Sequence, residues 1–289
     1  MLTVLVFIVT LLAAGCSQPP GAGGQETMKV AVTLPPQAEM VREVGGGHVE
    51  VQVVVPPGAD PHTFEPTAGE LVRLSDNILY FRIGPDLLPF EDVLVSRLQE
   101  IEPGIRVIDS SEGVTLLAST DPDERGSPDP HIWLSLRNAE IMTAHVRDAL
   151  IEADPANAAE YQANSDEYIS RLREADEDIR QGLSGSGVHT ILVTHPSWGY
   201  FARDYGLTQV AIGEEGKEPT ARELEHLVNL ALKENIRVIF AEPEFSVRGA
   251  EVLAAEINGT VILVDPLAED YLENMRRVAV AFEGEGETS

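Results

Sequence analysis

Short apolar runs rich in β-branched residues alternate with amphipathic segments along most of this chain. Four such runs fall in each half, and we predict strands at residues 29–34, 51–55, 78–83, 106–108, 190–193, 208–212, 237–240 and 261–264. Between them, the helical spacing of apolar positions predicts helices at 37–44, 91–101, 221–234 and 250–257. Repeated strand-helix units are typical of parallel sheets. The pattern therefore predicts an α/β fold with two lobes, each a four-stranded, mainly parallel sheet flanked by helices.

The middle of the chain breaks this alternation. Residues 136–183 contain no strand-like run, and Asp154 followed by Pro155 is typical of a helix start. Beyond that start, apolar residues recur at helical spacing, at Tyr161, Tyr168, Leu172, Ala175, Ile179 and Leu183. A helix over 155–184 would extend roughly 40 Å at about 1.5 Å per residue. We predict that this one long, rigid helix joins a lobe at 27–154 to a second lobe at 185–289.

The amino end has the pattern of an export signal. Residues 1–15 are mostly apolar and uncharged, and the run is shorter than the roughly 20 residues of a membrane-spanning helix. It ends in Leu-Ala-Ala-Gly-Cys, which resembles a bacterial lipobox, and Cys16 is the only cysteine. We expect a signal peptide at 1–15, lipidation at Cys16 and a lipid-anchored linker at 16–26. A cleaved signal, or an uncleaved anchor with an incidental cysteine, is the alternative. The folded part is expected at the extracytoplasmic face of the cell membrane or in the periplasm.

The net charge of the chain disfavours some classes of binding partner. A formal net charge of −28 repels phosphate backbones and argues against nucleic acid as a partner. The same field favours cations, although an acidic surface also serves solubility alone. The 43% of hydrophobic residues are enough to build real cores, so the chain is expected to be globular.

Four potential metal ligands stand at the ends of apolar runs. His62, His195 and Asp265 follow predicted strands, and His131 ends the irregular stretch 119–130. In open α/β sheets, ligands bind outside the carboxyl ends of the strands, so two ligands from each lobe would meet in the cleft between them. Three imidazoles and a carboxylate form a four-coordinate set that suits Zn²⁺. A proline next to each of the four stiffens its loop.

The remaining histidines have ordinary surroundings. His48 and His189 stand beside strand starts, and His145 and His226 lie in amphipathic helical segments with charged neighbours. We expect none of the four to bind metal.

Six ordered motifs carry a family resemblance that covers nearly the whole chain after residue 27. They are Asp60-Pro61-His62-Thr63-Phe64-Glu65-Pro66-Thr67, Asp129-Pro130-His131-Ile132-Trp133-Leu134, His195 with Gly199-Tyr200-Phe201-Ala202, Glu215-Gly216-Lys217-Glu218-Pro219, Phe240-Ala241-Glu242-Pro243 and Asp265-Pro266-Leu267. Together they resemble the metal-binding lipoproteins of zinc and manganese ABC importers.

This resemblance implies a metal held in the interlobe cleft and delivered to the membrane permease of an ABC importer. His62, His131, His195 and Asp265 fall on the family's ligand positions. Histidine at 195 favours Zn²⁺, and Mn²⁺ remains the alternative, since hard Mn²⁺ is better served by a second carboxylate. Zinc members often carry a long histidine-rich loop between the first two ligands, whereas residues 119–128 are short and acidic and contain no histidine.

Enzymatic and adhesive functions fit the sequence less well. The chain has no His-Glu-x-x-His, Gly-x-Ser-x-Gly or glycine-rich phosphate-loop motif. A metallohydrolase would need an open fourth position on the metal, and Asp265 would close it. We therefore expect a monomeric binding protein with no enzymatic activity. A surface adhesin is the remaining alternative.

Overall fold

The computed structural model describes residues 27–120, 126–213 and 219–284. The predicted signal peptide, Cys16 and the linker at 16–26 lie outside these residues. Two sheets of four parallel strands form the two lobes, in the orders β2-β1-β3-β4 and β6-β5-β7-β8. The strands are β1 Met28–Val32, β2 Val49–Val53, β3 Leu79–Arg82, β4 Arg106–Asp109, β5 Thr190–Val193, β6 Thr208–Ala211, β7 Val238–Ala241 and β8 Thr260–Leu263. All eight predicted strands are confirmed, with ends shifted by at most two residues.

Both sheets are parallel because helices connect their strands. Helices cover both faces, so the central strands are buried: all four residues of β3 are buried, including Arg82 at its end. In the first lobe Val30 pairs with Val51 on one side and with Leu79 on the other. The helices are α1 Pro35–Gly45, α2 Ala68–Leu74, α3 Pro89–Ile101, α4 Leu136–Ala153, α5 Ala158–Ser186, α6 Gly199–Tyr205, α7 Ala221–Glu234, α8 Arg248–Ile257 and α9 Tyr271–Phe282.

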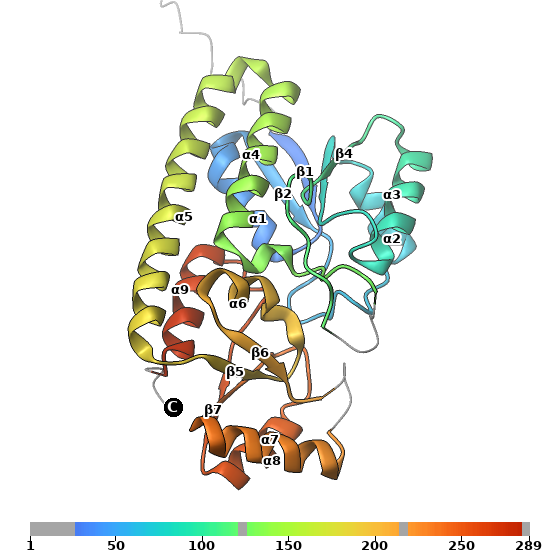
Figure 1. The fold of residues 1–289 in the computed structure, drawn as a ribbon. Helices are drawn as coiled ribbons and strands as arrows, with labels where there is room; N and C mark the ends of the chain where they lie inside the picture. The colour runs from blue at the N-terminus through green and yellow to red at the C-terminus, as the bar shows by residue number, and fades with distance from the viewer. Residues whose placement is uncertain (1–26, 121–125, 214–218, 285–289) are drawn as a thin grey trace, which may run out of the picture.

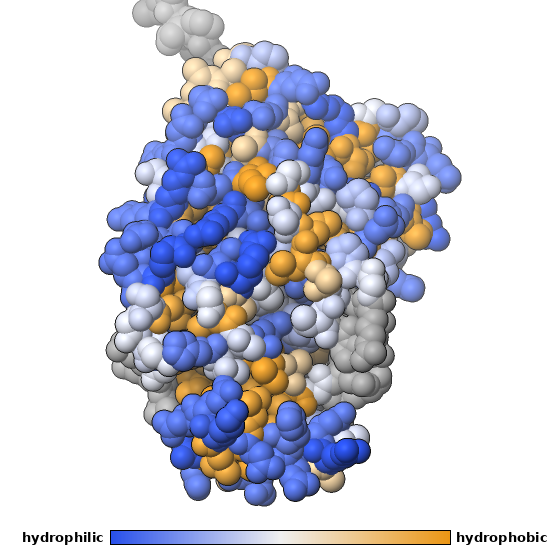
Figure 2. All heavy atoms as spheres, in the orientation of Figure 1, coloured by the Kyte–Doolittle hydropathy of each residue, from blue (hydrophilic) through white to orange (hydrophobic). Residues whose placement is uncertain are grey.

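Helix α5 runs along one side of both lobes (Figure 1). It has 29 residues and follows a short 3-10 turn at Pro155–Asn157, so the predicted long helix is confirmed, with its first turn in the tighter form. It ends at Gly187, whose φ of +75° is a backbone conformation that glycine adopts without strain. The predicted apolar stripe is buried, and hydrophilic residues cover the outer side of α5 (Figure 2).

Each lobe has an apolar cluster of its own, and a further apolar cluster extends across both lobes. A single cluster of buried residues includes Leu34 and Tyr80 of the first lobe, Tyr168 and Leu172 of α5, and Phe240 and Phe282 of the second lobe. Hydrogen bonds also cross between the lobes: Trp133 Nε1 donates to the Pro266 carbonyl at 2.8 Å, and the Tyr271 hydroxyl donates to the Trp133 carbonyl at 2.7 Å. These contacts hold the lobes in a defined arrangement and position the loops between them. Across the described ranges, we find no helix with the length and apolar character needed to span a bilayer.

Candidate metal centre

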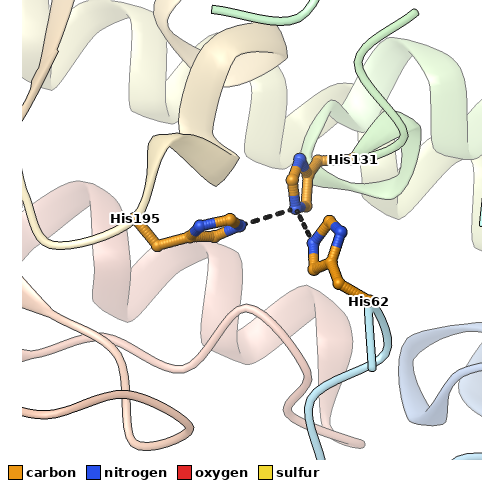
Figure 3. A group of neighbouring side chains, drawn as sticks. All are labelled: His62, His131 and His195. Carbon is orange, nitrogen blue, oxygen red and sulfur yellow. Dashed lines mark hydrogen bonds between the residues drawn. The ribbon is translucent and has the colours of Figure 1, made fainter. Parts of the chain in front are cut away.

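Three of the four predicted ligands meet between the lobes. His62 lies in the loop after β2, and His131 lies immediately before the 3-10 turn Ile132–Leu134. His195 lies two residues after the end of β5. Their rings point toward one another (Figure 3). His131 Nε2 lies 3.2 Å from His62 Nε2 and 3.2 Å from His195 Nε2. In the described part of the chain, these three residues form the group whose ligand atoms all lie within 4.8 Å of one another.

These nitrogen separations match those of a tetrahedral metal site. Ligands at about 2.0–2.1 Å from a tetrahedral Zn²⁺ lie about 3.3 Å from each other. His131 and His195 are buried, at 5% and 4% exposure, and His62 is partly exposed. The cavity that the three share has a volume of about 10 Å³, which holds an ion or a water but excludes an organic solute. The geometry therefore favours a single metal ion.

A buried carboxylate orients the central imidazole. Asp129 Oδ1 lies 2.8 Å from His131 Nδ1, and it also accepts the His131 backbone N–H at 2.9 Å. A carboxylate beside Nδ1 holds the proton on that nitrogen, which leaves the lone pair of Nε2 directed at the centre. The tautomer that this contact favours is the one that metal binding requires.

The same turn occurs three times around the centre. Asp60, Asp129 and Asp265 each precede a proline, and in each case Oδ1 accepts the backbone N–H two residues later, at 2.9, 2.9 and 2.7 Å. An Asp side chain that caps its own turn, followed by a proline with fixed φ, makes a rigid loop end. In the first two turns the third residue is a candidate ligand, His62 or His131. In the last turn the third residue is Leu267.

Asp265 therefore has a different position from the three histidines. Its side chain occupies the capping position of its turn, and it lies outside the group formed by the histidine nitrogens. Burial, and then the charge of Asp270, raise its pKa. Pro266 and Leu267, the next two residues, line the cavity. The structure thus brings Asp265 to the edge of the centre without placing its carboxylate among the imidazoles.

Two further carboxylates lie beside the centre and were not predicted as site residues. Glu242 and Glu244 follow β7 and line the same cavity. Glu242 is 1% exposed; Ser197 Oγ and Trp198 Nε1 donate to its Oε1, which anchors the turn that follows His195. Burial raises the pKa of Glu242 well above its usual range. Burial, with the charges of Asp265 and Asp60, raises the pKa of Glu244 to about 7. The sequence signal for Glu244 was its place after a strand, whereas Glu242 also belongs to the Phe240-Ala241-Glu242-Pro243 motif.

The other histidines lie elsewhere. His48 Nε2 pairs with Glu160 Oε2 at 3.0 Å, and His145 Nε2 lies 2.9 Å from the Glu112 carbonyl oxygen. Across the described residues, neither they nor His189 and His226 belong to a group of three metal-ligating side chains.

Comparison with known proteins places the chain in a family. The sequence profile of the family described as "Zinc-uptake complex component A periplasmic" matches residues 30–284, so the chain belongs to that family of solute-binding transport proteins. A Treponema pallidum (strain Nichols) protein that is named as metal-binding is 30% identical, over 93% of this chain and 90% of its own length. The high-affinity zinc uptake system protein ZnuA of Bacillus subtilis (strain 168) is 26% identical, over 89% of this chain and 85% of its own length.

A solved structure of a ZnuA protein has the same architecture. It is 37% identical, with a TM-score of 0.83, and the match covers 90% of this chain and 99% of that one. A second structure, a ZnuA deletion mutant with zinc bound, is 36% identical with the same TM-score, over 91% of this chain and 100% of that one. The predicted α/β fold of two lobes joined by a long helix is confirmed.

Proposed function

We propose that this protein captures one divalent metal ion, Zn²⁺, between its lobes and delivers it to the permease of an ABC importer. The observation that carries the proposal is the convergence of His62, His131 and His195 Nε2 atoms at the spacing of a tetrahedral site. Relatives named for zinc uptake, and a zinc-bound ZnuA structure of the same fold, support it. Three neutral imidazoles favour borderline Zn²⁺ over hard Mn²⁺, which is the alternative cargo.

Asp265 is proposed as the fourth ligand. Its turn engages Oδ1 with the Leu267 N–H, so Oδ2 is the oxygen that we propose binds an ion held by the histidines. A fourth protein ligand closes the coordination shell of the metal. A closed shell suits capture, because catalysis by zinc needs an open position for water or substrate. We therefore propose a binding protein without enzymatic activity of its own.

The test of this function is metal-dependent growth. Deleting the gene is expected to abolish growth in metal-depleted medium, and added Zn²⁺ should restore it. A copy of the gene with His131→Ala should fail to complement the deletion, whereas His145→Ala should complement fully. Unchanged growth of the deletion strain would contradict metal import, and rescue by Mn²⁺ but not Zn²⁺ would establish the alternative cargo.

We further propose that Cys16 carries a lipid that tethers a monomeric folded part outside the cytoplasmic membrane. The proposal rests on the Leu-Ala-Ala-Gly-Cys sequence and on the absence of any other cysteine. Replacing Cys16 by Ser should move the protein from the membrane fraction to the soluble extracytoplasmic fraction. Retention of the Cys16→Ser protein in the membrane would show that the apolar segment itself is the anchor.

A further inference from the structure

Glu244 lies at the metal centre although its sequence context gives it no obvious role there. It follows β7, the strand that lies between β5 and β8 in the second sheet. These two neighbours lead to His195 and Asp265. All three strands are parallel, so their carboxyl ends meet at one edge of the sheet, and Glu244 lines the same small cavity as the three histidines.

The protein leaves part of the hydrogen-bonding capacity of the Glu244 carboxylate unused. Its Oε2 atom is buried and accepts no hydrogen bond from the described residues. Glu242, two positions earlier, differs: its Oε1 accepts from Ser197 and Trp198. A buried carboxylate oxygen without a donor is costly, and native proteins rarely leave one unless an ion or a water completes it.

The surrounding charges point to a cation as that partner. Asp265 and Asp60 are close enough to disfavour a negative charge on Glu244. Glu244 lines the histidine cavity and the other two carboxylates lie near it, so positive charge in the cavity would offset their mutual repulsion. A divalent ion at the histidine nitrogens would supply that charge within reach of the Glu244 loop.

We propose that Glu244 binds the metal as a second carboxylate, beside Asp265, and that it gives the centre the capacity to hold Mn²⁺ as well as Zn²⁺. The inference rests on the proposed function and extends it to metal selectivity. Zn²⁺ is satisfied by four ligands in a tetrahedron, so a fifth ligand adds little for it. Mn²⁺ favours carboxylate oxygens and higher coordination numbers, so the oxygen of Glu244 contributes mainly to its binding.

The test compares Glu244→Gln with wild type and with Glu251→Gln. Gln keeps the size of the side chain and removes its charge, and Glu251 is an exposed residue on the nearby α8, which makes it the matched control. Mn²⁺ affinity is measured from the loss of the free-ion electron paramagnetic resonance signal at pH 7.5. Zn²⁺ affinity is measured by competition with a chromophoric chelator. Circular dichroism and thermal unfolding verify that each variant is folded.

Glu244→Gln is expected to weaken Mn²⁺ binding about tenfold or more and Zn²⁺ binding less than about threefold. The spectrum of bound Mn²⁺ should also change, because a ligand is lost, while Glu251→Gln leaves both affinities and the spectrum unchanged. Equal losses for the two metals, an unaltered spectrum, or a wild-type protein that binds no Mn²⁺ would overturn the inference.

A third variant separates this inference from the proposed function. His131→Ala should lose both metals. If it does while Glu244→Gln binds Mn²⁺ like wild type, the role of Glu244 is wrong and the histidine centre stands. If His131→Ala keeps both metals at full affinity, the proposed function fails and the inference fails with it.

Discussion

The two lobes have the same strand order but contribute different chemistry to the centre. The first lobe supplies two imidazoles, His62 and His131, each on a rigid Asp-Pro turn. The second supplies one imidazole, His195, together with the carboxyl groups of Glu242 and Glu244. Two of the three nitrogen donors thus come from one lobe, and the carboxyl groups that line the cavity come from the other. Neither lobe alone carries a full set of metal ligands, so the binding site exists only where the two lobes meet.

The largest expected effect is that of pH, and it tests how much of the affinity comes from nitrogen. Imidazole binds metal only when neutral, so protonation below its ordinary pKa of about 6.5 competes with the ion at three positions; lowering the pH from about 7.5 to 5.5 should weaken Zn²⁺ binding on the order of 1000-fold. Affinity is therefore retained at higher pH and lost as pH falls. Chelator competition across this range measures it. A loss of less than tenfold would assign the affinity to the carboxylates of the second lobe.

Removing one imidazole of the first lobe is the next largest change. His131→Ala should weaken Zn²⁺ binding by at least about 100-fold, or ~2.7 kcal/mol, because the central nitrogen of the group is lost. Isothermal titration of the purified protein measures this loss. His145→Ala changes a histidine that contacts the Glu112 carbonyl oxygen, away from the centre, and should leave the affinity unchanged. Equal losses in the two variants would contradict the assignment of the site.

A smaller effect is expected from the carboxylate that orients His131. Asp129→Asn removes the charge beside Nδ1 and should weaken Zn²⁺ binding by about 10-fold to 100-fold. Asp109→Asn is the matched control, because Asp109 also holds a turn, through the Ser111 N–H and hydroxyl, without touching a ligand. Chelator competition measures the Zn²⁺ affinity of each variant. Similar affinities for both variants would show that Asp129 merely shapes its loop.

The smallest expected effect is on overall shape. Helix α5 packs along both lobes, and Trp133 and Tyr271 bond across them, so metal binding should move loops and tilt the lobes only slightly. Small-angle scattering with and without Zn²⁺ should differ in radius of gyration by less than about 1 Å. A contraction of several ångströms would show that the lobes close around the metal as independent bodies.

Much of the fold could be predicted because its signals are local. Alternating apolar runs located all eight strands, and the stripe from Tyr161 to Leu183 located the buried side of α5. The end of a strand also located His62 and His195, since parallel strands place their carboxyl ends at one edge. The first turn at Pro155–Asn157 adopts the tighter 3-10 form, a difference that the spacing of apolar residues does not encode.

The remainder of the site depends on contacts between residues far apart in the chain. Asp129 and Asp265 have the same sequence context, Asp before Pro, yet only Asp129 lies against an imidazole, because only there does the turn carry a histidine. Glu244 was missed because a glutamate in an irregular loop resembles any surface glutamate. The burial of its Oε2 atom becomes evident only when β7 is placed between β5 and β8. The role of Asp265 as a ligand stays a prediction.

A crystal structure of the Zn²⁺-loaded protein, with anomalous diffraction recorded at the zinc edge, tests the three-histidine metal centre most directly. We predict one anomalous peak per chain, between the Nε2 atoms of His62, His131 and His195 and about 2.0–2.1 Å from each, with a carboxylate oxygen of the second lobe completing the shell. A peak bound by fewer than three of these histidines, or a principal peak elsewhere on the acidic surface, would contradict it.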